Sequence, residues 1–162
     1  MQKEPMLRET FEKLSRELEQ LKNEERGKIA KIIDEARALG DLKENAEYHA
    51  AKEKQGMMEA RIIELGDLVG RAQVVDPSSL PHQRISFGST VTLIDVDTDK
   101  ELTYTIVGGQ ESDPEKGLIS FQSPLAKLLL GKEEGDDIRA NLPSGKKHYE
   151  IEEVFYREIV ID

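Results

Sequence analysis

The first half of the chain has the hydrophobic spacing of helices that pack side by side. Apolar residues recur at alternating intervals of four and three residues in Leu7, Phe11, Leu14, Leu18 and Leu21. This spacing places the side chains on one narrow stripe of an α-helix, as in the seam of a coiled coil. The pattern therefore predicts a first long helix with charged residues on its other faces.

Two further runs continue this spacing along the first half. The second run is Ile29, Ile32, Ala36 and Leu39, and the third is Met58, Ile62, Leu65, Val69 and Ala72. Only the residues around Gly40 interrupt the stripes, so we expect an antiparallel helical hairpin whose arms of ~30 residues would each be roughly 45 Å long. Two helices folded into a globular bundle remain an alternative.

The second half has the pattern of strands. Ser89–Val96 and Leu102–Val107 alternate and are rich in β-branched residues, and Asp97–Lys100 between them is a candidate turn. Further strands are expected at Leu118–Phe121, Ile138–Leu142 and Tyr149–Phe155, and a short helix at Leu125–Leu130 between Pro124 and Gly131. The fold class predicted is α+β: a helical coiled-coil hairpin followed by a small antiparallel β-sheet domain with one short helix.

A proline-rich stretch separates the two patterns. Residues 76–81 read DPSSLP and are expected to form a linker. We therefore predict a hairpin domain over residues 1–75 with its tip at residues 40–48, a sheet domain over residues 82–158, and a tail over residues 159–162.

Composition and charge narrow the class of function. The 162 residues carry a net charge of −10, and 35% of them are charged, against about 25% in a typical domain. The chain has no cysteine, only three scattered histidines (His49, His82 and His148), and no long apolar run. These features argue against thiol chemistry, a histidine-built zinc site and a membrane span. The acidity disfavours a general nucleic-acid binder, so a cytoplasmic protein that meets other proteins is expected.

Two acidic residues stand at the predicted turn between the helices. Asp41 is followed three residues later by Glu44, and Gly40 precedes them. One interpretation is structural: Gly40 ends the first helix, while Asp41 and Glu44 form a capping box for the second. The other is functional, because two carboxylates at one point can complete a Mg²⁺ site held mainly by another macromolecule. Spacing alone leaves both interpretations open.

Two segments resemble the signatures of the GreA/GreB family of bacterial transcript cleavage factors. The first is GDLKENAEYHAAKEKQG, residues 40–56, and the second is ISFQSPLAKLLLGKEEGD, residues 119–136. The resemblance covers about residues 1–158 and is stronger to GreA, which implies a preference for short extruded RNA. It also implies an FKBP-like fold for the second domain.

The resemblance implies a factor that binds RNA polymerase and inserts its coiled coil into the secondary channel. There it would stimulate the polymerase's own cleavage of the nascent RNA 3′ end, without being a nuclease itself. Asp41 and Glu44 match the acids that hold a second Mg²⁺ jointly with the polymerase. We expect the isolated chain to bind no ion tightly and to be a monomer.

Other site residues follow from the same resemblance. Arg37 and Lys52 match a basic patch that faces the extruded RNA, although both could be ordinary solvated helix charges. The tip would be supported by Gly40, Asn45, Tyr48 and His49. The loop Gln122, Ser123 and Pro124 matches a polymerase contact, and could equally be a turn that leads into the short helix.

Three alternative functions remain at this stage. The first is an inhibitor that blocks the polymerase channel, which the intact pair Asp41 and Glu44 disfavours. The second is a coiled-coil adaptor or chaperone in which the tip is only a capped turn. The third is a prolyl isomerase, which the few aromatic residues of the second half disfavour because most of them lie on strand patterns.

Overall fold

The computed structural model describes residues 2–161 and contains two compact units. One consists of Phe11–Ala72 with residues 2–4, and the other of Pro5–Thr10 with residues 73–161. This division differs from the predicted one at both ends of the hairpin. The reason is a two-stranded sheet of β1 (Glu4–Leu7) and β2 (Ala72–Val75), which hydrophobic spacing did not indicate.

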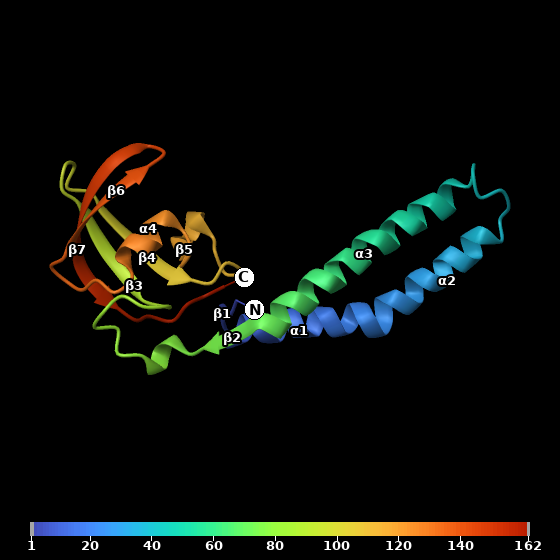
Figure 1. The fold of residues 1–162 in the computed structure, drawn as a ribbon, viewed down its shortest axis with the longest axis horizontal. Coiled ribbons are helices and arrows are strands. Elements are labelled where there is room, and N and C mark those ends of the chain that lie inside the picture. The colour runs from blue at the N-terminus through green and yellow to red at the C-terminus, as the bar shows by residue number, and fades with distance from the viewer. Residues whose placement is uncertain (1, 162) are drawn as a thin grey trace. The chain divides into compact units, whose positions relative to one another are not determined.

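The first unit is the predicted helical hairpin. Its first arm contains α1 (Arg8–Gln20), a π-helical segment (Leu21–Glu25) and α2 (Arg26–Arg37), and its second arm is α3 (Ala46–Arg71). Figure 1 shows this first arm running alongside α3, with a loop joining α2 to α3. The 26 residues of α3 make this helix about 39 Å long at 1.5 Å per residue.

The π-helical segment changes which residues face the seam of the hairpin. Continuing the 4,3 spacing beyond Leu21 would bring residue 32 into the seam, but a turn closed by i→i+5 bonds takes in one extra residue. The backbone N–H of Arg26 accordingly donates to the carbonyl of Leu21. The residues buried in α2 are Ile29, Ile33 and Ala36, one position later than the uninterrupted spacing requires.

This shift corrects part of the predicted stripe. Ile32 is 49% exposed and Leu39 is 68% exposed, so neither is buried in the seam. The third run is closer to the prediction, because Ile62 and Leu65 are buried. The seam near the tip contains Ile29, Ile33 and Ala51, with Tyr48 and Met58 packed against them.

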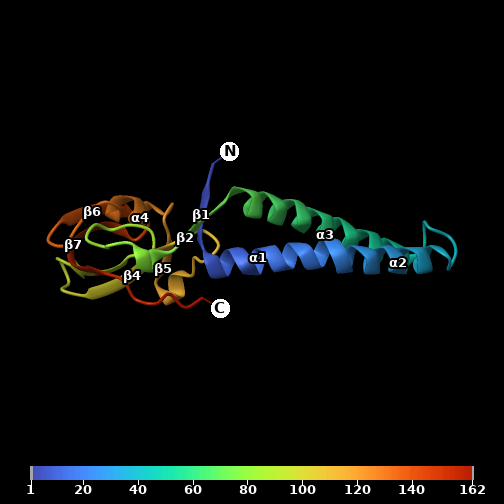
Figure 2. The same ribbon diagram turned by 90° about the horizontal axis from the view of Figure 1, so that it is seen from below.

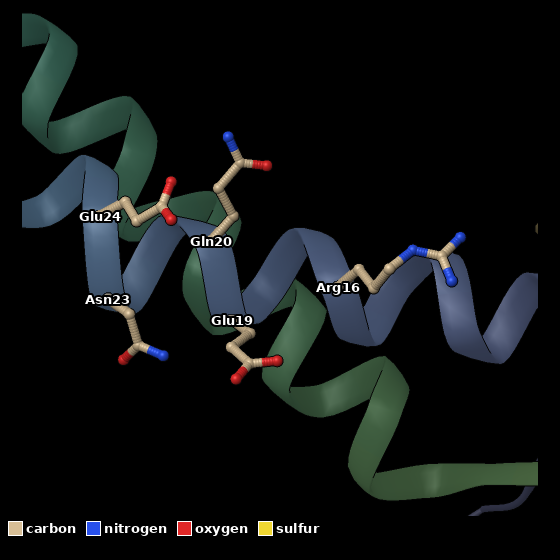
Figure 3. A pocket seen from close by; sticks show the side chains of 5 residues that line it. All are labelled: Arg16, Glu19, Gln20, Asn23 and Glu24. Carbon is tan, nitrogen blue, oxygen red and sulfur yellow. The ribbon is translucent and has the colours of Figure 1, made fainter.

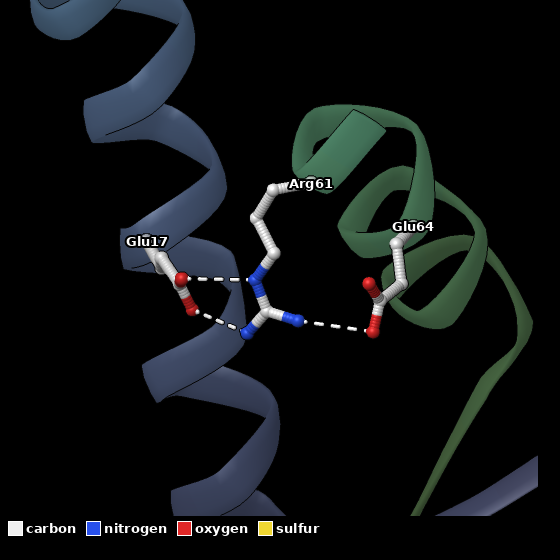
Figure 4. A network of polar contacts seen from close by, with 3 residues as sticks. All are labelled: Glu17, Arg61 and Glu64. Atoms are coloured by element: carbon white, nitrogen blue, oxygen red, sulfur yellow. Dashed lines mark hydrogen bonds and ion pairs between the residues drawn. The ribbon is translucent and has the colours of Figure 1, made fainter. Parts of the chain in front are cut away.

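Charged pairs connect the two arms outside the seam. Arg61 on α3 donates to both carboxylate oxygens of Glu17 on α1 at 3.0 Å, and also to Glu64 (Figure 4). Arg26 makes a similar two-point contact with Glu59 at 2.9 Å, which lowers the pKa of the Glu59 carboxyl through hydrogen bonding. Such exposed pairs add little stability, but their paired geometry favours one alignment of the arms.

The second unit is built on a five-stranded sheet in the order β5-β4-β3-β7-β6. Its strands are β3 (Thr90–Asp95), β4 (Glu101–Val107), β5 (Leu118–Ser120), β6 (Asp137–Leu142) and β7 (Gly145–Phe155). The pairing of β4 with β5 is parallel, whereas the other three pairings are antiparallel. The sheet is therefore mixed rather than wholly antiparallel, because residues 108–117 cross over between β4 and β5.

The short helix α4 (Pro124–Leu129) covers this sheet as predicted. Its Ala126 and Leu129 are fully buried in one core with strand residues such as Leu93 and Ile151. Figure 2 shows the curled strands and α4 of this unit from below. A short 3₁₀ helix (Pro77–Ser79) occupies the predicted linker, and another (Pro114–Lys116) precedes β5. None of the helices between residues 2 and 161 is long and apolar enough to cross a bilayer.

Candidate functional site: the tip of the hairpin

The tip is the loop that joins α2 to α3. The first helix ends with Ala38 as its C-cap, and Gly40 follows with a φ of +129°. A non-glycine residue is strained at this angle, so Gly40 turns the chain here as its position suggests. It lies two residues after the C-cap, one residue later than an ideal Schellman position.

Asn45, and not Asp41, caps the second helix. The Asn45 side-chain oxygen accepts from the backbone N–H of Tyr48 at 3.0 Å, and Asn45 Nδ2 donates to the carbonyl of Ala36 at 2.6 Å. One side chain therefore binds the start of α3 and the end of α2. The predicted capping box of Asp41 and Glu44 is wrong, because α3 begins at Ala46. The signal for Asn45 was present, since asparagine is as strong an N-cap as aspartate.

The two acids are consequently left in the loop. One carboxylate oxygen of Asp41 accepts from the backbone N–H of Lys43 at 3.0 Å, which forms a tight local turn. Glu44 makes no hydrogen bond or ion pair through its side chain to any residue in the range 2–161. Both side chains are exposed. The carboxylate of Glu44 therefore has no structural role in the hairpin.

His49 and Tyr48 support the loop from α3. His49 Nε2 donates to the carbonyl of Lys43 at 3.1 Å, which ties the middle of the loop to the helix. The ring of Tyr48 contacts His49 edge-on, with centroids 5.6 Å apart, and packs on the seam. These contacts order the backbone on both sides of the acids, while leaving the carboxylates in solvent.

The predicted basic patch has its own partners within the hairpin. The guanidinium of Arg37 lies 5.9 Å from the centre of the Tyr48 ring and 3.8 Å from Asp34. Lys52 donates to the side-chain oxygen of Gln55 at 3.1 Å. Both cations are exposed, so these weak local contacts do not prevent either from meeting a phosphate.

The residues Gln122, Ser123 and Pro124 form the start of α4. Ser123 is the N-cap, because its hydroxyl oxygen accepts from the backbone N–H of Ala126 at 3.3 Å, and Pro124 opens the helix. The side chains of Gln122 and Pro124 are exposed. The expected turn into the short helix is thus present. The exposed side chains of Gln122 and Pro124 are accessible to a partner protein.

Metal binding at the tip can be judged from its ligands. Two exposed carboxylates without a cationic partner are hard oxygen donors, as Mg²⁺ prefers. Residues 2–161 contain no group of three or more acidic or histidine side chains able to hold an ion. Asp41 and Glu44 therefore fit an ion whose remaining ligands come from a partner or water.

A polar hollow lies elsewhere on the first arm. It is lined by Arg16, Glu19, Gln20, Asn23 and Glu24, beside the π-helical segment. Figure 3 shows these side chains pointing in different directions rather than toward one point. This arrangement does not converge on a ligand, so the tip remains the better candidate site.

The fold and the tip together define an α+β protein with a helical hairpin that presents two free acids. The sequence model for the N-terminal part of transcription elongation factors matches residues 4–74, and the model for the GreA/GreB C-terminal part matches residues 80–156. The chain belongs to the GreA/GreB family of transcription elongation factors.

Two GreA proteins agree with this assignment. The chain is 72% identical over 161 residues to a transcription elongation factor GreA of Sulfurovum sp. (strain NBC37-1), with 99% of each chain covered. It is 56% identical to the GreA of Helicobacter pylori (strain ATCC 700392 / 26695), covering 100% of this chain and 99% of the other. Among solved structures, Gfh1 of Thermus thermophilus matches with 27% identity and a TM-score of 0.44, covering 95% of this chain and 99% of Gfh1.

We expect the dual contact of Asn45 to stabilise the tip measurably. Replacing Asn45 with Ala removes the cap of α3 and the bond to Ala36, at a cost of about 1–2 kcal/mol. Asn45→Asp is the matched control, because it keeps an acceptor for the Tyr48 N–H but loses the donor to Ala36. Hydrogen exchange of the Tyr48 amide should be fastest in Asn45→Ala, slower in Asn45→Asp and slowest in the parent. Equal exchange rates in the three proteins would contradict the capping role.

Proposed function

We propose that the chain acts on backtracked bacterial RNA polymerase and stimulates cleavage of the extruded RNA 3′ end. In this proposal the hairpin enters the secondary channel of the polymerase, and its tip reaches the catalytic centre. The polymerase cleaves the RNA, and the chain contributes ligands without being a nuclease. The observation that carries the proposal is the pair of exposed carboxylates at the end of the hairpin, of which Glu44 has no partner in the described part of the fold.

Asp41 and Glu44 would hold a Mg²⁺ ion jointly with the polymerase. When bound, such an ion supplies Lewis-acid activation of water for hydrolysis of a phosphodiester. The chain's own residues orient the ligands: the turn at Lys43 directs Asp41, while Asn45 and His49 tie the loop to both helices. Because these contacts order the loop, the backbone that bears the two acids is held in place before it meets the polymerase.

Two features of the tip argue against the alternative functions. The adaptor or chaperone interpretation relied on the acids being only a helix cap, and Asn45 fills that role instead. An inhibitor would need a tip that cannot hold the ion, whereas both carboxylates are available here. Cleavage stimulation is therefore the better-supported function for this tip.

The direct test uses stalled elongation complexes of bacterial RNA polymerase with 3′-labelled RNA. Adding the protein in the presence of Mg²⁺ should release short 3′ fragments and leave RNA that can be extended. Protein incubated with the same RNA without polymerase should release none. Binding to the complexes without any fragment release would favour the inhibitor.

We further propose that Arg37 and Lys52 contact the phosphates of the extruded RNA. Replacing both with Ala should slow cleavage of long backtracked RNA. It should also make the slope of log affinity against log salt concentration shallower by about 0.7 per lost contact, the value for single strands. Lys28→Ala with Lys31→Ala is the matched control, because it removes two exposed positive charges from α2. Equal salt dependence in both variants would count against the basic patch.

Gln122 and its neighbours Ser123 and Pro124 would contribute to polymerase binding at the surface of the second unit. Exposure of Gln122 and Pro124 beside a rigidly capped helix supports this role. A monomer is sufficient for this mechanism, since one tip supplies both acids.

A further inference from the structure

The hairpin carries an apolar groove between α2 and α3, near the tip but separate from the acids. The groove has a volume of about 540 Å³, and its apolar lining includes Ile29, Ile32, Ala50 and Met57. This volume lies within the range of ligand-binding clefts. Ile32 is 49% exposed and Met57 is 68% exposed, so two large apolar side chains border the groove in solvent.

The π-helical segment places one of the apolar side chains, that of Ile32, at this groove. Its extra residue moves Ile33 into the seam and leaves Ile32 on the adjacent face of α2. The seam is already filled by Ile29, Ile33 and Ala51, so Ile32 is not needed to fill it. Ile32 does not stand alone on the surface but lies with Met57 at the same groove, and exposed apolar side chains that lie together mark interaction sites.

The shape and charge of the groove indicate what it would accept. A groove between two antiparallel helices, with the small buried residue Ala51 in its lining, fits the apolar face of a third helix. Its charged lining contains the carboxylates of Glu47 and Glu53 and the single ammonium of Lys54. A helix that carries Lys or Arg beside its apolar residues would complement this excess of negative charge.

We propose that this groove docks an amphipathic helix of RNA polymerase, with apolar side chains against Ile32 and Met57 and basic ones near Glu47 and Glu53. This inference rests on the proposed function, since it names a contact made by the inserted hairpin. A second copy of the chain is a poorer occupant. Each copy carries a net charge of −10, and the groove would meet the same excess of carboxylates.

The test compares binding of two variants to stalled elongation complexes of bacterial RNA polymerase. Ile32→Gln with Met57→Gln should weaken binding about tenfold or more, because two apolar side chains lose their burial. Cleavage at saturating protein should be unchanged, since the tip is intact. Ile63→Gln is the matched control, because Ile63 is 73% exposed on α3 and lies outside the groove. The affinity of this variant for the elongation complexes should stay within about twofold of that of the parent.

Several outcomes would overturn the proposal. If the double variant binds with the affinity of the parent, the groove is not a docking site. The proposed function would still hold in that case, provided that the parent stimulates cleavage. Failure of the parent itself to bind polymerase would overturn both. A photoreactive phenylalanine analogue at position 32 should crosslink to a helical segment of the polymerase, and crosslinks confined to loops would contradict a helix. A parental dimer that Ile32→Gln with Met57→Gln dissociates would show that a second copy is the occupant.

Discussion

Replacing Asp41 with Asn and Glu44 with Gln should reduce stimulated RNA cleavage by about 100-fold or more, the scale of losing a group that stabilises charge at a reacting centre. The fold should be unaffected. The amide oxygen introduced at position 41 would still accept from the Lys43 N–H, and Glu44 has no partner in the described chain to lose. Cleavage is measured at several Mg²⁺ concentrations, where the loss should be greatest when the ion is scarce.

The matched control for this experiment is Glu19→Gln with Glu24→Gln. These glutamates are exposed on the first arm of the hairpin, so the control makes the same change in charge away from the tip. Polymerase affinity should be equal in both double variants. If the tip variant cleaves like its parent at limiting Mg²⁺, Asp41 and Glu44 do not hold the ion.

Gly108→Ala should destabilise the second unit by about 1–3 kcal/mol, the usual cost of overpacking. A Cβ at residue 108 would collide with the backbone carbonyl of Pro5 and lie 2.8 Å from Glu111 Oε1. Glu111 is 4% exposed, and its carboxylate accepts from the backbone N–H groups of Gly108 at 2.8 Å and Leu7 at 3.3 Å. The added methyl group therefore disturbs the contact that holds Pro5–Leu7 in this unit.

Gly66→Ala is the matched control, with the opposite expected sign. Gly66 lies within α3, and an added Cβ would meet nothing within 4 Å. The substitution lowers the entropy of the unfolded chain and should raise stability by about 0.5–1 kcal/mol. Denaturant unfolding of the two variants measures both effects. If Gly108→Ala proves more stable than the parent, the Pro5 backbone moves away from the added methyl group without loss of stability, and the prediction is wrong.

Much of the fold followed from local patterns. The 4,3 spacing predicted both arms of the hairpin, and alternation with β-branched residues predicted the regions of β3 and β4. The acids at residues 41 and 44 were located at the turn for the same reason, because the stripes stop on either side of them. Each of these features depends on side chains within one element, where neighbouring residues are related by a fixed repeat.

Other features depended on contacts between distant segments. The capping of α3 by Asn45 is coupled to a bond with Ala36 nine residues earlier, and no local rule separates Asn45 from Asp41 as a cap. The strand β1 is defined by pairing with β2, more than sixty residues away. The parallel addition of β5 likewise depends on where the crossover returns to the sheet.

By itself, the sequence determined that this protein has a charged helical hairpin with two acids at its turn and a separate sheet domain, because helical and strand periodicities are local. Only the tertiary structure decided that Asn45 is the cap, which leaves Glu44 without a partner in the described chain. It also decided that Ile33 and not Ile32 fills the seam. The physical reason is that the π-helical segment and the Asn45 bond to Ala36 select among residues that the local pattern treats as equivalent.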